Sequence, residues 1–273
     1  MHSFDRLSRR EMLRLSAGTL LAAGLWPGWL HADDAPESGE FSFIVINDLH
    51  YLDDKGDPWF ELVVGMIKQM KQSPELCLLV GDLADIGTAG QLAAIRDHFK
   101  PLKLDVHVVI GNHDYIKNDS RATFDELYKD SINYRFDHRG WQFVALDSTD
   151  GWQVRGTKIQ PATLQYLDDV VPKLDKEKPT VLFTHFPLGP DLRERPKNAE
   201  DVLNRFKQHN LQAVYNGHFH GFTEHQVRKA IVTTNKCCSF AKGNHDGTKE
   251  KGFFLCTASE GKIARKSFEV KSA

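Results

Sequence analysis

Short apolar runs alternate with longer amphipathic segments along most of the chain beyond residue 40. Five runs rich in β-branched or aromatic residues predict strands at residues 41–46, 76–80, 106–110, 180–184 and 212–215. Between them, apolar residues at helical spacing predict helices that begin near Asp57, Thr88, Pro161 and Asn198. Strands that alternate with helices in this way are typical of an α/β domain.

Two of these helices carry start signals. Asp57 followed by Pro58 predicts an N-cap acid with proline at the first helical position. Thr88 and Gln91 have the spacing of a capping box, in which each side chain bonds to the backbone N–H of the other residue. Both helices then repeat apolar residues on one face, which we expect in the core.

The remaining segments predict further strands. Residues 132–147 form a β-rich stretch, and the C-terminal third predicts antiparallel strands at residues 222–228, 230–234, 252–257 and 262–269. The predicted sheets are therefore mixed. No linker rich in Gly, Pro or Ser divides residues 41–273, so we treat them as one domain.

Composition and charge narrow the possible partners. The chain of 273 residues is 41% hydrophobic and 26% charged, which is ordinary for a globular domain. Its formal net charge is −2 and it has no long run of Lys or Arg. There is thus no electrostatic case for a surface that binds nucleic acid or an anionic membrane, and a small substrate is the better expectation.

The N-terminal residues have the pattern of a targeting segment, because a basic start runs into the apolar stretch 15–25. The segment Ser8-Arg9-Arg10-Glu11-Met12-Leu13-Arg14 resembles the twin-arginine signal, which exports folded proteins. Cleavage after Ala32 would give a signal peptide at 1–32, a short linker at 33–40 and the domain at 41–273. We therefore expect the twin-arginine export machinery as a partner and the periplasm, or an equivalent exported space, as the location.

The alternative to cleavage is a membrane anchor. Residues 15–30 are short for a span of about 20 apolar residues, and they contain Pro27 and glycines. The first cysteine, Cys77, lies far from any cleavage site, which argues against a lipid anchor. No stable membrane anchor is expected.

The four cysteines show neither a CxxC pair nor a regular spacing, so no dense disulfide framework is implied. Cys77 and Cys256 lie in apolar runs and are expected in the core. A bond from Cys256 to Cys237 or Cys238 stays open, since the periplasm would permit it.

Polar residues follow five of the predicted strands at the point where each strand ends. These residues are Asp48 and His50, Asp82, Asn112 with His113 and Asp114, His185, and finally His218 and His220. Ligands of open α/β sheets bind outside the carboxyl ends of the strands, so these side chains should converge. Taken singly, each is an ordinary loop residue; their order and their position at strand ends favour a common site.

Such a crowd of carboxylates and imidazoles would be costly without compensation, because it would leave repelling charges and unpaired polar groups. Divalent cations resolve that cost. Oxygen and nitrogen ligands without a thiolate suit Mn, Fe or Zn, and seven ligands are too many for one tetrahedral zinc. The sequence therefore predicts two divalent metal ions that share one carboxylate.

The motifs DxH, GD, GNHD, a lone His and GHxH occur in this order in the calcineurin-like metallophosphoesterase superfamily, which residues 41–265 resemble. The resemblance implies a four-layer α/β/β/α sandwich with two mixed β-sheets. It implies one metal held by Asp48, His50, Asp82 and His220, and a second held by Asp82, Asn112, His185 and His218. Asp82 would bridge the two.

The resemblance also implies a reaction, the hydrolysis of a phosphate ester by a hydroxide that bridges the two metals. His113 would protonate the leaving alkoxide or neutralise the developing charge. Asp114 would hold the imidazole of His113 in a useful orientation. Neither residue is a predicted metal ligand.

Within the superfamily, the segment Gly81-Asp82-Leu83-Ala84-Asp85-Ile86-Gly87 looks most like the class III cyclic-nucleotide phosphodiesterase branch. Purple acid phosphatases carry a metal-binding tyrosine where this chain has Asp85. Because cyclic nucleotides are signals of the cytoplasm, an exported enzyme would act on other small phosphodiesters or monoesters. Two alternatives stay open, a non-catalytic binding scaffold with the same fold and a strict phosphomonoesterase.

A second GNHD tetrad, residues 243–246, repeats the first. The first copy ends an apolar strand, whereas the second lies in a polar segment, so we interpret the second as a loop beside the pocket. In the alternative interpretation, Asn244 and His245 of this loop contact the substrate.

Overall fold

The computed structural model describes residues 39–116 and 120–271. The predicted signal peptide at residues 1–32 lies outside the described residues and stays a prediction. The strands predicted at 41–46, 76–80 and 180–184 have the predicted bounds, and the third predicted strand is shifted by one residue to Asp105–Val109.

One sheet has five strands in the order β11-β10-β1-β2-β3. Its three parallel neighbours are β1 (Phe41–Ile46), β2 (Leu76–Val80) and β3 (Asp105–Val109). Strand β10 (Lys251–Ser259) pairs antiparallel with β1 and with β11 (Lys262–Val270). The C-terminal hairpin therefore extends a parallel sheet built by the N-terminal half, and this sheet is mixed.

The other sheet has six strands in the order β4-β5-β6-β7-β9-β8. The parallel strands are β5 (Trp141–Leu146), β6 (Thr180–Thr184), β7 (Leu211–Asn216) and β9 (Ala230–Thr234). The edge strands β4 (Tyr134–His138) and β8 (Thr223–Val227) are antiparallel to their neighbours. This sheet is mixed as well.

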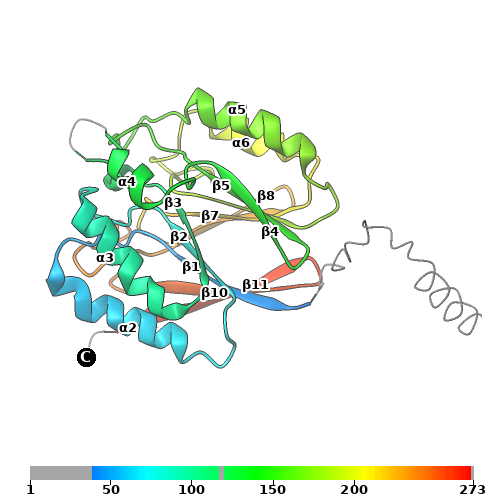
Figure 1. The fold of residues 1–273 in the computed structure, drawn as a ribbon. Coiled ribbons are helices and arrows are strands. Elements are labelled where there is room, and N and C mark those ends of the chain that lie inside the picture. Colours follow the sequence, from blue (N-terminus) through cyan, green and yellow to red (C-terminus); the bar gives the residue numbers. More distant parts are fainter. Residues whose placement is uncertain (1–38, 117–119, 272–273) are drawn as a thin grey trace, which may run out of the picture. The chain divides into compact units, whose positions relative to one another are not determined.

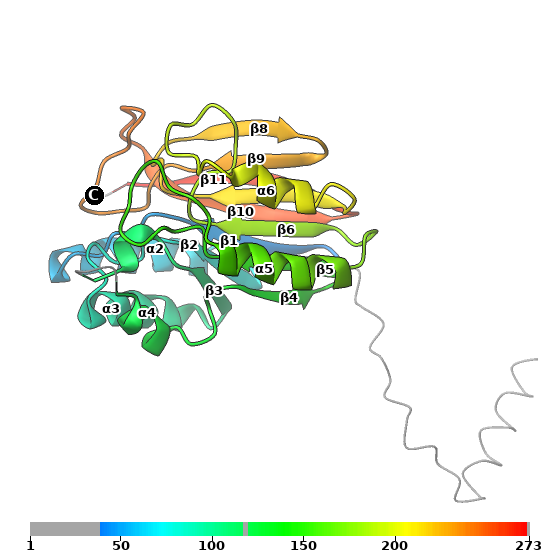
Figure 2. The ribbon, with the colours of Figure 1, turned by 90° about the horizontal axis from the view of Figure 1, so that it is seen from above.

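Helices cover the outer face of each sheet (Figures 1 and 2). On the side of the first sheet lie α2 (Asp57–Lys68), α3 (Ala89–Phe99) and the short α4 (Ala122–Leu127); on the side of the second lie α5 (Pro161–Val170) and α6 (Ala199–Arg205). Short 3-10 helices occur at Asp54–Gly56, Lys100–Leu102, Asn112–Asp114 and Val171–Lys173.

Three apolar cores fill the spaces between adjacent layers. One lies between the first sheet and its helices, and includes Phe60 and Ile95. A second fills the space between the two sheets with residues such as Phe43 and Phe143. The third lies between the second sheet and its helices. The prediction of a four-layer α/β/β/α sandwich with two mixed β-sheets is confirmed.

The helix start signals are realised only in part. The N-cap of α2 is Gly56, so the prediction of Asp57 as N-cap is wrong. The Asp57 carboxylate instead accepts the Tyr51 hydroxyl at 2.7 Å and bonds to His98 Nε2 at 2.9 Å. Thr88 caps α3, but the Gln91 side chain bonds outside the helix, so the capping box is half formed.

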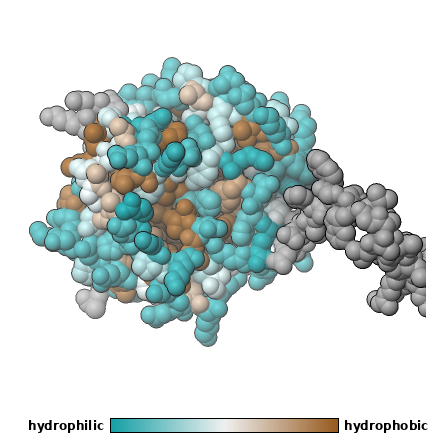
Figure 3. Space-filling view, viewed as in Figure 1, coloured by the Kyte–Doolittle hydropathy of each residue, from teal (hydrophilic) through white to brown (hydrophobic). Residues whose placement is uncertain are grey.

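The surface seen in Figure 3 is largely hydrophilic, with apolar residues showing between polar ones. Among the described residues no helix is long and apolar enough to cross a membrane. All four cysteines are buried and free, so the open pairing of Cys256 with Cys237 or Cys238 is not formed. The burial of Cys77 and Cys256 agrees with the prediction.

Candidate metal centre

The loops that follow five strands bring the seven predicted ligands together between the carboxyl edges of the two sheets. Strands β1, β2 and β3 of the first sheet lead into Asp48 with His50, Asp82 and Asn112; β6 and β7 of the second lead into His185, His218 and His220. All seven side chains are buried, with at most 7% of each residue exposed. Buried polar groups of this kind need partners or cations.

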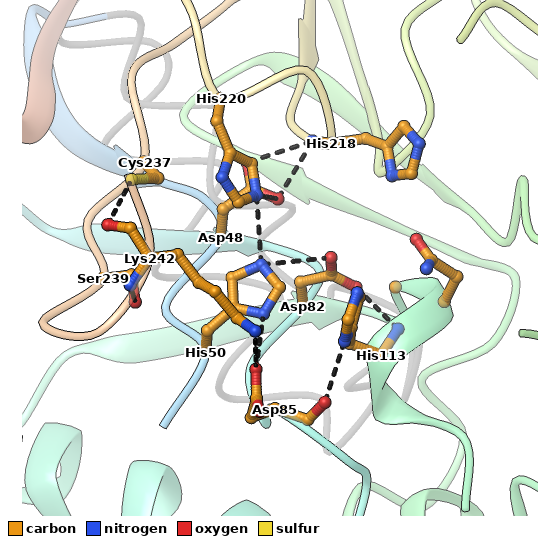
Figure 4. A network of polar contacts seen from close by, with 12 residues as sticks. Asp48, His50, Asp82, Asp85, His113, His218, His220, Cys237, Ser239 and Lys242 are labelled. Atoms are coloured by element: carbon orange, nitrogen blue, oxygen red, sulfur yellow. Dashed lines mark hydrogen bonds and ion pairs between the residues drawn. The ribbon is translucent and has the colours of Figure 1, made fainter. Parts of the chain in front are cut away.

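Asp48, His50, Asp82 and His220 form the first ligand group, in which the candidate ligand atoms all lie within 4.8 Å of one another (Figure 4). His220 Nε2 is 3.2 Å from Asp48 Oδ1 and 3.0 Å from His50 Nε2. Two ring nitrogens and two carboxylates therefore point at one small volume.

The second ligand group contains Asp82, His185 and His218. Asn112 belongs beside it, because its Oδ1 atom is 3.3 Å from His185 Nε2. Asp82 is common to both groups and divides its oxygens between them. Its Oδ2 lies 3.4 Å from His50 Nε2, whereas its Oδ1 lies 3.2 Å from His185 Nε2.

Five of these seven residues adopt positive φ angles, a backbone conformation that residues other than glycine rarely adopt. The angles are 54° at Asp48, 44° at His50, 50° at Asp82, 66° at His218 and 49° at His220. Such conformations cost on the order of 1–3 kcal/mol each and tend to cluster at functional sites. The strain turns successive polar side chains inward from short loops.

The glycines of the GD and GNHD motifs permit the loops to approach the ligands closely. A Cβ on Gly81, whose φ is +78°, would lie 2.4 Å from His185 Nδ1. A Cβ on Gly111 would lie 2.2 Å from the Asp82 backbone nitrogen. Neither position accepts a side chain while the site keeps this geometry.

Three of the four ligand histidines are hydrogen-bonded through their second ring nitrogen. His185 Nδ1 donates to Val80 O at 3.0 Å, and His220 Nδ1 donates to Gly243 O at 3.1 Å. His218 Nε2 donates to Val154 O at 2.9 Å, and His50 Nδ1 faces Asp85 Oδ1 at 3.5 Å. The three hydrogen bonds fix the tautomers of His185, His218 and His220 and leave the other nitrogen of each ring for a metal. The contact of His50 with Asp85 is an ion-pair distance and not a hydrogen bond.

The two buried carboxylates control the protonation of the histidines beside them. Burial opposes ionisation of Asp48 and Asp82, but the neighbouring histidines hold the pKa of both carboxyls below its usual range. Burial lowers the pKa of both His185 and His220, but neighbouring groups outweigh it. Asp82 and Asp48 raise the pKa of His185 to about 9, and Asp48 together with Cys237 raises that of His220 to about 11. Burial and His185 lower the pKa of His218 to about 3. Two buried carboxylates that attract protons onto adjacent imidazoles also attract cations.

The donor set fits two divalent cations. Two groups of oxygen and nitrogen atoms share one carboxylate, each histidine has a lone pair facing inward, and no thiolate takes part. Cations held there would replace the protons on His185 and His220.

His113 lies beside this centre. Its backbone N–H donates to Asp82 Oδ1 at 2.8 Å, and its ring lies 4.7 Å from the ring of His50. Its Nδ1 donates to the backbone carbonyl of Asp85 at 2.8 Å. The Nε2 edge is thereby available to a substrate.

The prediction that Asp114 orients the imidazole of His113 is wrong, because the Asp85 carbonyl occupies that position. The Asp114 carboxylate accepts the backbone N–H groups of Ala84 and Gly111, each at 2.8 Å. It is fully buried, and burial together with the Asp82 charge raises its pKa to about 8. Asp114 thus ties the loop after β2 to the loop after β3.

The second GNHD tetrad lies in a loop beside the first ligand group, where Gly243 O accepts the Nδ1–H of His220. Asn244 cannot serve the substrate, because its Oδ1 accepts the Cys237 N–H and its amide donates to Thr248 and Glu250. His245 stacks on His220, with ring centroids 4.5 Å apart and planes 11° apart.

Sequence reasoning missed the residues that support the ligands. Asp85 faces His50 and forms an ion pair with Lys242, whose Nζ is 2.7 Å from Asp85 Oδ1. The His50 contact favours the charged form of Asp85, burial opposes it, and Lys242 helps to bring its pKa to about 2. The only feature of the sequence that pointed to Asp85 was that purple acid phosphatases have a metal-binding tyrosine at this position. The backbone carbonyls that hold the histidines could not be predicted from the sequence, because every residue has a carbonyl.

Comparison with known proteins gives a consistent picture. The family described as calcineurin-like phosphoesterase matches residues 41–222. A probable cyclic nucleotide phosphodiesterase of Fibrobacter succinogenes is 30% identical over 169 residues, which cover 58% of this chain and 62% of that protein. A 3',5'-cyclic adenosine monophosphate phosphodiesterase of Pseudomonas aeruginosa is 25% identical over 200 residues, 70% of this chain and 71% of that protein.

The chain thus spans less than two thirds of the length of the first of these curated relatives. Among solved structures, a purple acid phosphatase from yellow lupin seeds has a TM-score of 0.64 at 12% identity. That alignment covers 86% of this chain and 52% of the lupin chain. At this level of identity the likeness concerns the fold alone.

Proposed function

This chain belongs to the calcineurin-like phosphoesterase family, and from that premise we propose that it is a metal-dependent phosphoesterase that hydrolyses phosphodiester or phosphomonoester bonds of small substrates. The observation that carries the proposal is the position of Asp82. One buried carboxylate presents a different oxygen to each of two ligand groups, which is the arrangement that two adjacent cations require.

The residues would divide as follows. Asp48, His50 and His220 would hold one divalent cation, Asn112, His185 and His218 would hold the other, and Asp82 would hold both. Two such cations lower the pKa of a bound water and neutralise phosphoryl oxygens in the transition state. Mn, Fe and Zn all suit this donor set.

His113 would act on the leaving group. Its ring is set between the Asp85 carbonyl and the ring of His50. Because Nδ1 keeps its proton for that carbonyl, Nε2 would donate a proton in the imidazolium form of the ring. An ester oxygen that leaves as an alkoxide needs that proton, since alkoxides are poor leaving groups at neutral pH. Asp85 is then the residue that orients His113, through its backbone.

The proposed class of substrate depends on where the protein acts. The similarity to proteins named as cyclic nucleotide phosphodiesterases supports the branch of the family. The twin-arginine motif at Arg9 and Arg10 supports export to the periplasm or an equivalent space. Under that proposal the substrates are small phosphodiesters or monoesters outside the cytoplasm.

A direct test compares two chromogenic esters. We expect the Mn-loaded protein to bind two ions and to hydrolyse bis(p-nitrophenyl) phosphate. Turnover of p-nitrophenyl phosphate alone would favour the strict phosphomonoesterase. Two bound ions without turnover of either ester would contradict the proposal and favour the binding scaffold.

A further inference from the structure

Residues 236–250, which connect β9 to β10 and contain the second GNHD tetrad, approach the first ligand group from two sides. On one side, Gly243 O accepts the Nδ1–H of His220 at 3.1 Å. On the other side, Lys242 Nζ lies 2.7 Å from Asp85 Oδ1, and the same oxygen is 3.5 Å from His50 Nδ1. Adjacent residues of one loop thus contact His220 directly and His50 through Asp85. Figure 4 shows Lys242, Asp85 and His50.

We propose that Lys242 is a positioning residue for the metal of the first ligand group, and that it acts through Asp85 on His50. The inference rests on the proposed function, because it requires that the first ligand group binds a metal. Under this proposal the loop that contains the second tetrad supports the metal ligands, whereas the first tetrad supplies a ligand itself.

The geometry supplies the reason. A carboxylate behind a ligand histidine fixes the orientation of the ring and makes its other nitrogen a better donor to the metal. Here the carboxylate can do so only if Oδ1 stays directed at His50. Lys242 contacts that same oxygen and holds it in place.

The pair contributes little to folding. The Lys242 side chain is 38% exposed and the Asp85 side chain 15% exposed. Ion pairs with a solvent-exposed partner contribute little to stability, because water screens the charges. A variant without the lysine should therefore fold, and its effect should appear in metal binding.

The effect should be confined to one metal. His185 and His218 of the second ligand group are held by the carbonyls of Val80 and Val154, outside residues 236–250. Loss of Lys242 leaves both carbonyl contacts intact. The two metal sites should therefore respond differently to the same substitution.

The test is a stepwise titration of metal-free protein with Mn²⁺, in which free Mn²⁺ is followed by its electron paramagnetic resonance signal. For Lys242→Met we expect one of two equivalents to bind about 10- to 100-fold more weakly and the other to be unchanged. Asp85→Asn should weaken the same equivalent, and combining both substitutions should add little. Lys242→Arg should restore most of the affinity, because it keeps a cation at Asp85.

Lys251→Met is the matched control. Lys251 Nζ donates to Ser239 O at 2.7 Å and to Phe240 O at 3.3 Å, so it braces the same loop without contacting Asp85. We expect both Mn²⁺ equivalents to bind it as they bind the wild type. Equal weakening in the Lys242 and Lys251 variants would overturn the inference, since loop packing would then suffice.

Two further outcomes separate this inference from the proposed function. Wild-type protein that binds two Mn²⁺ ions, together with a folded Lys242→Met variant of unchanged affinity, would refute the role of Lys242 alone. Wild-type protein that fails to bind two ions would refute the metal centre, and the role of Lys242 with it.

Discussion

Asp82 is the residue on which both ligand groups depend. Its two oxygens face His50 and His185, and Oδ1 also accepts the backbone N–H of His113. A φ of 50° places it among the strained residues of the site. Replacement of Asp82 would therefore remove a carboxylate from both ligand groups at once.

We therefore expect Asp82→Ala to lose both metals and all measurable phosphoesterase activity. Asp82→Asn is the matched variant, because asparagine tolerates positive φ better than alanine and keeps the size of the side chain. Metal content by elemental analysis and turnover of bis(p-nitrophenyl) phosphate are the measurements. Two tightly bound ions in the alanine variant would show that Asp82 does not bridge.

His113 permits a different prediction, because it contacts the centre without belonging to either predicted ligand set. His113→Ala should keep both metals and lower kcat by about 10²- to 10⁴-fold. The loss should be greatest for esters with poor leaving groups, since these depend most on protonation. Rates for a series of aryl and alkyl phosphodiesters measure this, and equal slowing across the series would remove His113 as the acid.

At the scale of elements, the edges of the two sheets meet through aromatic rings. His107 of β3 stacks on Phe136 of β4, with ring centroids 3.6 Å apart and planes 6° apart. Burial lowers the pKa of His107 to about 4, while Asp105 raises it and His138 lowers it. The folded protein thus prefers the neutral ring at this contact.

This preference makes stability depend on pH. In the unfolded chain a histidine takes up a proton below a pKa of about 6.5, whereas folded His107 resists it down to about 4. The contribution of the neutral ring is complete above about pH 6.5 and is lost as the pH falls toward 4. Because His107 is partly exposed, the loss between pH 7 and pH 5 should be on the order of 1 kcal/mol.

Urea unfolding at pH 7 and pH 5 measures that loss. His107→Phe keeps an aromatic ring against Phe136 and removes the titrating group, so its stability should fall less between the two pH values. An equal fall in wild type and variant would assign the pH dependence to other residues.

At the scale of the whole molecule, the sandwich places the ligand-bearing ends of two sheets against each other. The first sheet supplies Asp48, His50, Asp82 and Asn112, and the second supplies His185, His218 and His220. The apolar core between the sheets sets their separation. Residues 170 positions apart, such as His50 and His220, thereby come within 3.0 Å.

Export is a property of the whole chain, and its predicted signal lies outside the described residues. We expect the double substitution Arg9→Lys and Arg10→Lys to retain the protein in the cytoplasm, because the paired arginines are the recognised feature. Arg14→Lys is the control and should leave export unchanged. Cell fractionation with an immunoblot measures both, and periplasmic protein in the double variant would contradict the twin-arginine route.

Much of this architecture could be predicted from the sequence. Strand positions followed from local apolar runs, and the seven candidate ligands followed from polar residues directly after strands. Such features depend on neighbours in the chain, where spacing alone carries the information. The order of the layers, with two sheets inside and helices outside, was predicted from the resemblance to a family with a known fold.

Only the tertiary structure decided which groups support the ligands. It showed that the Asp85 carbonyl, and not Asp114, orients His113, and it placed the Asp85 carboxylate, paired with Lys242, behind His50. These contacts join loops far apart in the sequence and often use backbone carbonyls, which every residue has. The sequence by itself therefore determined which residues could bind metals, whereas the packing of two sheets determined what holds those residues in place.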